Sequence, residues 1–138
     1  MIVLDTNVLS ESLRPRPSSR VMEWLRSQPI AALFTTAITE AEMHFGLELL
    51  PPGKRRAALQ NAVRQMFDAD MAGRVLPFDS AAAQVFARLA AARRRSGSPI
   101  SQSDAQIAAI ARSRGAALAT RNTPDFADCE VELTDPWR

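Results

Sequence analysis

Short apolar segments alternate with longer amphipathic ones along the chain, and this alternation is the main structural signal in the sequence. The short segments run for only a few residues and are bounded by polar or turn-forming positions, as buried strands are. Strands are expected at residues 2–4, 32–35, 74–78, 116–120 and 131–133.

The longer segments carry apolar residues three or four positions apart, which places these residues on one face of a helix. Helices are expected at residues 20–27, 37–50, 54–70, 80–95 and 102–114. Ser18 or Ser19 can cap the first of them, and Gly115 is placed to end the last. Residues 14–17 alternate arginine with proline and are expected as a loop, because proline disfavours a helical conformation in the residue before it.

Strands that alternate with helices imply a parallel sheet covered on both faces, because each parallel connection must cross the sheet. The expected fold class is therefore α/β, a three-layer α/β/α sandwich with a mainly parallel central sheet. The chain has 138 residues and shows no linker or internal repeat. We expect residues 1–138 to form a single domain.

Composition indicates a globular protein of a reducing compartment. Hydrophobic residues make up 46% of the chain and charged residues only 23%, which argues for a globular fold and against a disordered chain. Cys129 is the only cysteine, so no disulfide can form within the chain. No apolar run approaches the roughly 20 residues that cross a bilayer, and the first apolar stretch lacks the basic start of a signal peptide. A cytoplasmic protein without membrane contact is expected.

The formal net charge is only +2, yet the basic residues are clustered. Lys54-Arg55-Arg56 and Arg93-Arg94-Arg95 form two dense groups, and Arg14, Arg16 and Arg20 form a looser third. Such groups can attract a nucleic-acid backbone, but they are also typical of solvated helix faces. Net charge leaves both interpretations open.

Polar residues follow two of the predicted strands directly. The set is Asp5, Thr6 and Asn7 after the first strand, and Thr120 and Asn122 at the end of the fourth. The carboxyl ends of parallel strands lie at one sheet edge, where α/β folds place their ligands, so these side chains are expected to meet. The alternative for Asp5 and Asn7 is that they only cap or turn the next segment.

Glu42 is the acid that falls among apolar positions in the helix expected over residues 37–50. The main apolar stripe of that helix consists of Ile38, Ala41, Phe45 and Leu49. An acid within a core-facing stripe is costly unless it is paired or metal-bound, so Glu42 is a site candidate. Glu40 shares a polar face with His44 and Glu48 and is expected at the surface. The alternative for Glu42 is a buried salt bridge to an arginine.

The same helix carries a second apolar group, formed by Met43, Leu47 and Leu50. A helix that is apolar on two sides is buried on two sides. We expect either that the helix over residues 54–70 covers this group or that the group forms a dimer contact.

Asp104 lies on the apolar face of its helix, because Ile107 and Ala108 follow three and four positions later. The residues from Ser101 to Asp104 also match a capping box, so a capping role and a catalytic role both remain open. Asp125 is either an additional acid beside the site or part of an ordinary turn.

Asp5, Glu42, Asp104 and the amide of Asn122 together suit one cleft. Several acids in a half-buried cleft cannot all stay ionised without a cation. Oxygen ligands without cysteine or histidine favour Mg²⁺ or Mn²⁺, ions that activate water and neutralise charge on a phosphodiester. The sequence therefore predicts metal-dependent phosphate chemistry.

These motifs resemble those of PIN domains, and in particular those of the VapC/FitB-like toxins of bacterial toxin–antitoxin pairs. The resemblance rests on residues 2–7, 39–42, 103–104 and 120–126, and it extends to the ending Pro136-Trp137. It implies a metal-dependent endoribonuclease that binds Mg²⁺ or Mn²⁺. The implied metal ligands are Asp5, Glu42 and Asp104, with Thr6, Asn7, Thr120 and Asp125 around them and Asn122 where many relatives carry a fourth acid.

The resemblance also implies partners. These are an RNA substrate, a second copy of the chain in a homodimer, and a cognate antitoxin that inserts a peptide into the active-site groove. Promoter DNA would be bound only through the antitoxin.

Two other function classes compete with this interpretation. Asn122 in place of an acid leaves open a catalytically weak PIN-like binding module that acts in an antitoxin/DNA regulatory complex. A receiver domain or an aspartate-nucleophile phosphatase also places an aspartate after a strand. Both are disfavoured, because the only lysine, Lys54, lies in the wrong region and no second aspartate follows Asp5 closely.

Overall fold

In the computed structural model, which describes residues 1–138, every pair of neighbouring strands in the central sheet is parallel. The strand order is β3-β2-β1-β4-β5. The strands are β1 (Ile2–Leu4), β2 (Leu33–Thr36), β3 (Val75–Leu76), β4 (Ala117–Ala119) and β5 (Leu133–Thr134). Each predicted strand is present within a few residues of its expected position.

Six α-helices connect these strands. They are α1 (Thr6–Ser12), α2 (Ser19–Ser27), α3 (Ala37–Glu48), α4 (Lys54–Gln65), α5 (Ser80–Arg95) and α6 (Gln102–Ser113). Three shorter helical turns complete the chain, namely η1 (Ile30–Ala32), the π-helical η2 (Met66–Asp70) and η3 (Thr123–Phe126). The predicted cap positions are confirmed at Ser18, which caps α2, and at Gly115, which follows α6 with φ of 65°. None of the helices combines the length and the apolar character that a bilayer crossing requires.

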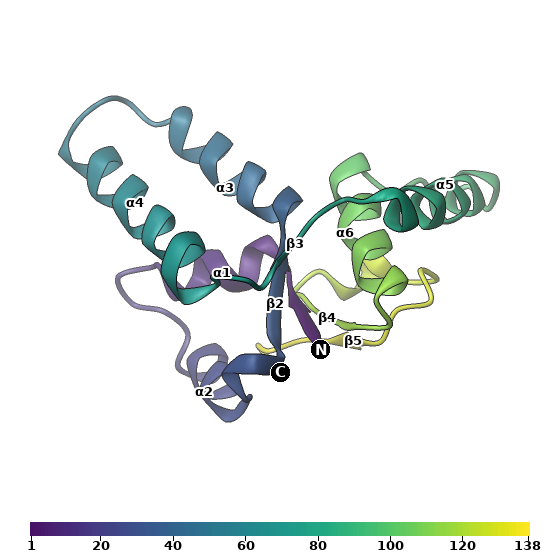
Figure 1. Cartoon of the computed structure of the whole chain (residues 1–138), viewed down its shortest axis with the longest axis horizontal. Coiled ribbons are helices and arrows are strands. Elements are labelled where there is room, and N and C mark those ends of the chain that lie inside the picture. The colour runs from purple at the N-terminus through teal and green to yellow at the C-terminus, as the bar shows by residue number, and fades with distance from the viewer.

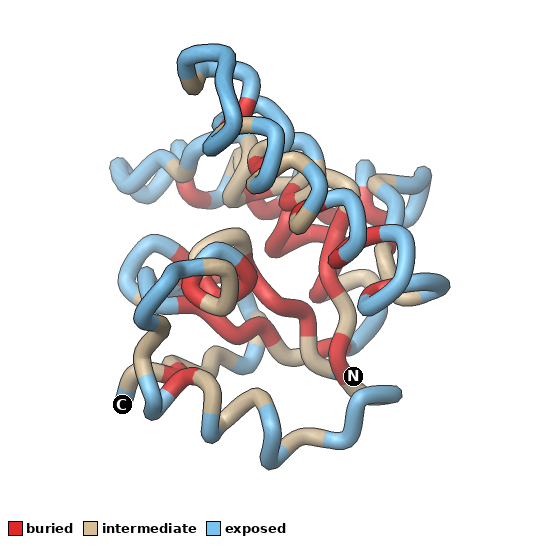
Figure 2. Tube along the Cα trace, turned by 90° about the vertical axis from the view of Figure 1, so that its left-hand side faces the viewer, coloured by how far each residue is buried: buried red, intermediate tan, exposed pale blue.

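Helices cover both faces of the sheet, with α5 and α6 on one side and α1 to α4 on the other (Figure 1). Neighbouring residues of β1 therefore face different cores. Val3 packs in a cluster with α5, α6 and Leu118, whereas Leu4 packs in a cluster with residues of α1 to α4. Figure 2 shows the buried positions gathered along the sheet and the inner helix faces. The predicted three-layer α/β/α sandwich is confirmed.

Helix α1 is the one α-helix that the sequence pattern does not predict. It is only 7 residues long, too short for an apolar period to stand out, although its residues Val8 and Leu9 are buried. It begins directly after Asp5, at the carboxyl end of β1. The helix expected over residues 54–70 is also different, because it is α-helical only to Gln65 and then widens into η2.

Helix α3 turns a different face to the core from the one expected. Its buried residues are Thr39, Met43 and Leu47, whereas Phe45 and Leu49 are 65% and 70% exposed. The stripe expected to face the core is therefore wrong, apart from the partly buried Ile38.

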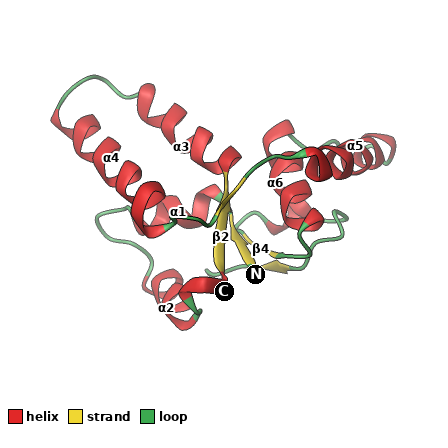
Figure 3. Ribbon diagram, in the orientation of Figure 1, coloured by secondary structure: helices red, strands yellow, loops and turns green.

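The physical reason is the helical hairpin that α3 forms with α4, which projects beyond the sheet (Figure 3). Met43 and Leu47 share a core cluster with Val63 of α4. The alternative in which the helix over residues 54–70 covers the second apolar group is thus confirmed. Because α3 carries apolar residues on more than one face, the spacing of these residues alone could not identify the buried face.

Candidate active site

Asp5 occupies the carboxyl edge of the sheet, at the end of the central strand β1, and is only 4% exposed. Its Oδ1 accepts a 2.8 Å hydrogen bond from the backbone N of Thr6, which caps α1. Its Oδ2 accepts a 2.8 Å bond from Thr120 Oγ1 and a 3.4 Å bond from Asn7 Nδ2. Asp5 is therefore both a helix cap and a fixed carboxylate in a polar cluster.

Asn7 and Thr120 join the two strand ends across the sheet. Asn7 Nδ2 lies 3.3 Å from Thr120 Oγ1, and Asn7 Oδ1 accepts a 3.3 Å bond from the backbone N of Arg121. The backbone N of Asn122 donates to Thr120 Oγ1 at 3.1 Å. The prediction that side chains after β1 and β4 meet at one edge is confirmed for Asp5, Asn7 and Thr120, whereas Asn122 takes part only through its backbone.

Glu42 reaches the same cluster from α3. Thr6 Oγ1 donates a 2.8 Å hydrogen bond to Glu42 Oε1 and also lies 3.2 Å from Thr39 Oγ1. No arginine forms a salt bridge with Glu42, so the alternative of a buried ion pair is wrong. Glu42 is half-buried and keeps one carboxylate oxygen free of hydrogen bonds to the protein.

Asp104 lies in the first turn of α6, where Ser101 is the N-cap. The Ser101 hydroxyl accepts a 3.2 Å hydrogen bond from the backbone N of Asp104. The reciprocal bond of a capping box, from the Ser101 backbone N to the Asp104 carboxylate, is absent. The backbone of Asp104 thus takes part in capping, and its side chain is half-buried beside Ser101.

The acids act on one another electrostatically. Burial raises the pKa of Asp5 to about 6; hydrogen bonds from Thr120 and Thr6 lower it, and the negative charges of Asp104 and Glu42 raise it further. Burial also raises the pKa of Asp104, against a lowering by the Ser101 hydroxyl, and the neighbouring Asp125 adds to the rise. A cation in this cleft would offset both the burial and the repulsion that raise these pKa values, because it stabilises the ionised carboxylates.

The donor set fits a hard divalent ion, because every available ligand is an oxygen. The acids do not form a ready-made cage, since no three acidic, histidine or cysteine side chains lie close enough to share one ion. Asp5 is fixed by its hydrogen bonds, whereas Glu42 and Asp104 are partly exposed. An ion held by all three acids therefore requires side-chain rotation of Glu42 or Asp104.

Asn122 and Asp125 differ in their relation to the acids. The side chain of Asn122 is exposed and forms no hydrogen bond within the chain; only its backbone contacts Thr120. Asp125 lines a hollow of about 210 Å³ together with Asp104 and Ser101. Of the two candidates after β4, Asp125 is the one with a direct electrostatic effect on a predicted metal ligand.

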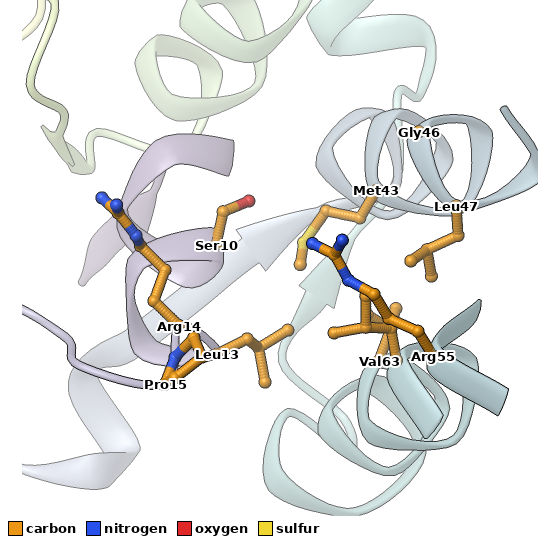
Figure 4. Close-up of a pocket in the computed structure, with 10 residues that line it drawn as sticks. Ser10, Leu13, Arg14, Pro15, Met43, Gly46, Leu47, Arg55 and Val63 are labelled. Atoms are coloured by element: carbon orange, nitrogen blue, oxygen red, sulfur yellow. The ribbon is translucent and has the colours of Figure 1, made fainter. Parts of the chain in front are cut away.

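A larger groove of about 490 Å³ lies between α1, α3 and α4 and was not predicted (Figure 4). Its walls are mainly apolar, and its lining includes Leu13, Met43, Leu47, Leu59 and Val63, with Arg14 and Arg55 beside them. Ser10 and Gly46 also line it, each four residues after Thr6 and Glu42 respectively, hence on the same helix faces. The groove therefore begins one helical turn from the contact between Thr6 and Glu42.

The basic clusters do not all lie at the surface. Arg93 is only 8% exposed, so the cluster of three on α5 presents only Arg94 and Arg95 to solvent. Arg56 is paired with Glu48 through a 2.6 Å contact. Neither interpretation of the clusters, as a nucleic-acid patch or as a solvated face, applies to Arg93.

Comparison with known proteins gives consistent matches. The sequence matches the PIN domain family over residues 2–130. VapC ribonuclease Y4jK of Sinorhizobium fredii is 43% identical over 137 residues, covering 99% of this chain and 98% of that protein. Toxin FitB of Neisseria gonorrhoeae is 39% identical over 137 residues, covering 99% of each. The solved structure of FitAB bound to an IR36 DNA fragment superposes with a TM-score of 0.93 and 40% identity, over 100% of this chain and 96% of that one.

Proposed function

Because this chain belongs to the PIN domain family, we propose that it is the toxin of a type II toxin–antitoxin pair and acts as a metal-dependent endoribonuclease. The observation that carries the proposal is the polar cluster at the carboxyl edge of the sheet, where Thr6 joins Asp5 to Glu42 and the charge of Asp104 acts on Asp5. Likeness over nearly the whole chain to proteins named VapC ribonuclease and Toxin FitB supports it.

Asp5, Glu42 and Asp104 would hold Mg²⁺ or Mn²⁺. Such an ion, when bound, lowers the pKa of a water molecule and neutralises charge on a phosphodiester. The chain's own residues prepare the ligands. Thr120 and Asn7 orient one oxygen of Asp5, and Thr6 uses its backbone N for Asp5 and its hydroxyl for Glu42.

We further propose that the substrate is RNA and that an antitoxin is the natural inhibitor of the site. The groove between α1, α3 and α4 starts next to the acids and has mostly apolar walls, as a peptide-binding groove does. The solved structure of FitAB bound to a DNA fragment contains a chain similar to this one, which supports a complex that binds DNA. A peptide in the groove would lie across the approach to Glu42.

A homodimer is the proposed assembly, and the exposed face of α3 is its proposed contact. Phe45 and Leu49 are four residues apart and therefore share one helix face, on which both are largely exposed. Exposed apolar patches of this kind favour association.

A binding module without strong catalysis is the second candidate. It is favoured by one observation: the acids do not form a ready-made metal cage, and Asn122 adds no charge to them. In that case the protein would act only within an antitoxin/DNA complex.

Cleavage of total cellular RNA by the purified, antitoxin-free protein tests the proposal. The reactions contain Mg²⁺, Mn²⁺ or EDTA, and compare the wild type with Asp5→Asn and with Asp68→Asn, a change at an exposed acid of η2. We expect discrete fragments that vanish with EDTA, and a loss of at least about a hundredfold for Asp5→Asn only. A folded wild type that leaves RNA intact with either ion would support the binding module instead.

A further inference from the structure

Arg93 is a buried cation that has no acidic partner. It lies in the last turn of α5, is 8% exposed, and takes part in no salt bridge. Its guanidinium remains charged inside proteins, so its donors must be satisfied by other groups. What Arg93 contacts instead of a carboxylate therefore indicates its role.

The guanidinium joins two segments of the chain that are far apart in sequence. Nε donates a 2.7 Å hydrogen bond to the carbonyl oxygen of Ser98. Nη1 donates 2.9 Å hydrogen bonds to the carbonyl oxygens of both Asp125 and Ala127, and lies 3.6 Å from Cys129 Sγ. Three carbonyl groups thus converge on one planar cation, a geometry that the fixed directions of the guanidinium donors can satisfy.

Each of the two segments carries an acid of the candidate site. The segment with Ser98 leads directly to Ser101, the cap of the helix that holds Asp104. The other segment contains Asp125 itself. Asp104, Asp125 and Arg93 line the same 210 Å³ hollow, and the charge of Asp125 acts on Asp104.

The segment after Asp125 has a backbone that needs external support. Asp128 and Glu130 adopt φ values of 61° and 57°, in the left-handed region that residues other than glycine rarely occupy. Such a conformation persists only where the surroundings determine it. The bonds from Arg93 to the carbonyls of Asp125 and Ala127 provide a direct constraint of this kind.

We infer that Arg93 is a positioning residue of the active site. It fixes the backbone at Asp125 and so sets the position of Asp125 relative to Asp104. Through this position it sets the affinity of the site for a divalent ion. The inference rests on the proposed function. Arg93 acts through the backbone, because it has no hydrogen bond to either carboxylate. Its contribution depends on the fixed directions of the guanidinium donors, so a lysine at this position does not reproduce it.

The test compares Arg93→Met, which keeps an apolar stem, and Arg93→Lys, which keeps the charge, with Arg94→Met, the same change at an exposed neighbour. Mn²⁺ binding is measured by electron paramagnetic resonance, and kcat and KM are measured on the RNA that the wild type cleaves. All variants are compared at a temperature at which circular dichroism shows them folded. Arg93→Lys is the second variant should Arg93→Met fail to fold.

Both Arg93 variants are expected to weaken Mn²⁺ binding by about ten- to a hundredfold and to lower kcat, as loss of a group that orients metal ligands does. The KM of the Arg93 variants for RNA should stay near the wild-type value, and so should the Mn²⁺ binding and kcat of Arg94→Met. Adding Asp125→Asn to Arg93→Met should cost less than the product of the two single effects, because both changes act on one acid.

Two outcomes separate this inference from the proposed function. A wild type that binds Mn²⁺ and cleaves RNA, together with an Arg93→Met that is less stable but unchanged in Mn²⁺ binding and kcat, would overturn the inference alone. A folded wild type that neither binds Mn²⁺ nor cleaves RNA would overturn the proposed function, and the inference with it.

Discussion

The hydroxyl of Thr6 donates a 2.8 Å hydrogen bond to Oε1 of Glu42, across 36 residues of sequence. The backbone N of the same threonine donates to Asp5. A single residue thus holds one oxygen of each of two acids, so the distance between these acids depends on the position of Thr6. Its two bonds can be separated experimentally, because one uses the backbone and the other uses the side chain.

Thr6→Val keeps the bond to Asp5 and removes the bond to Glu42. We expect RNA cleavage to fall by about tenfold or more, because Glu42 loses the group that orients it, while unfolding free energy falls by only about 1 kcal/mol. The measurements are kcat and chemical denaturation. Thr134→Val makes the same change at a side chain without a hydrogen bond, and equal effects of the two variants would reject the role of the Thr6 hydroxyl.

The raised pKa of Asp5 predicts an unusual pH dependence of stability in EDTA. The pKa is about 6 in the folded protein and 3.8 for an ordinary aspartate, so the folded state binds this proton more tightly. Stability should therefore fall as the pH rises from about 3 to 7, by about 3 kcal/mol from Asp5 alone. The raised pKa of Asp104 acts in the same direction.

Urea denaturation across this pH range checks the prediction. In Asp5→Asn the change of unfolding free energy with pH should shrink to the part that Asp104 contributes. This variant should also be more stable than the wild type at pH 7 in EDTA. The gain follows because the amide needs no cation, and such a trade of stability for activity is common in active sites. Equal slopes in both proteins would show that burial of Asp5 does not set this dependence.

Divalent ions should offset the loss of folding stability that comes from ionising the buried Asp5 carboxyl. Mn²⁺ at about a hundred times its dissociation constant should stabilise the wild type by roughly 2.7 kcal/mol, since it binds the folded state only. The shift in Tm should be larger at pH 7 than at pH 5, where protons compete for Asp5. Thermal unfolding with and without Mn²⁺ measures it. Asp5→Asn is the control, and the same shift in that variant would place the ion elsewhere.

The exposed face of α3 predicts which substitutions alter assembly. Phe45→Glu should reduce the molecular mass from that of a dimer to that of a monomer while the fold is kept, because Phe45 is 65% exposed. Leu47→Glu should instead destabilise the fold by about 3 kcal/mol or more, since Leu47 is 9% exposed and lies in the core with α4. Light scattering and circular dichroism distinguish the two effects. A dimer that survives both Phe45→Glu and Leu49→Glu would rule out this contact.

The fold and the position of Asp5 at the sheet edge could be predicted from the sequence because their signals are local. A buried strand followed by Asp5 indicates a carboxylate at a sheet edge, whichever helices surround it. The apolar stripe points to Glu42 for a reason that is wrong, since Phe45 and Leu49 of that stripe do not face the core. It remains a site candidate because the bond from Thr6, on a helix that the pattern missed, brings it to the cluster.

Arg93 shows a signal that was present but was interpreted as surface charge. Ala82, Val85, Leu89 and Arg93 are the buried residues of α5, and their spacing of three and four positions continues through the arginine. A charged residue that extends an apolar stripe is a candidate buried residue, just as an acid in that position is. The contacts of Arg93 with Asp125 and Ala127 could not be predicted, because they depend on the tertiary placement of a loop.

The pairing of β1 with β4 places Leu4 opposite Ala119, and with them Asp5 beside Thr120. These partners are 115 residues apart, so the cluster cannot close until almost the whole chain has been synthesised. During translation the emerging chain therefore contains Asp5 and Glu42 early, whereas the Thr120 hydroxyl that orients Asp5 is added only near the end. Under the proposed ribonuclease activity, this order of assembly would delay cleavage of RNA until the chain is long enough to fold completely.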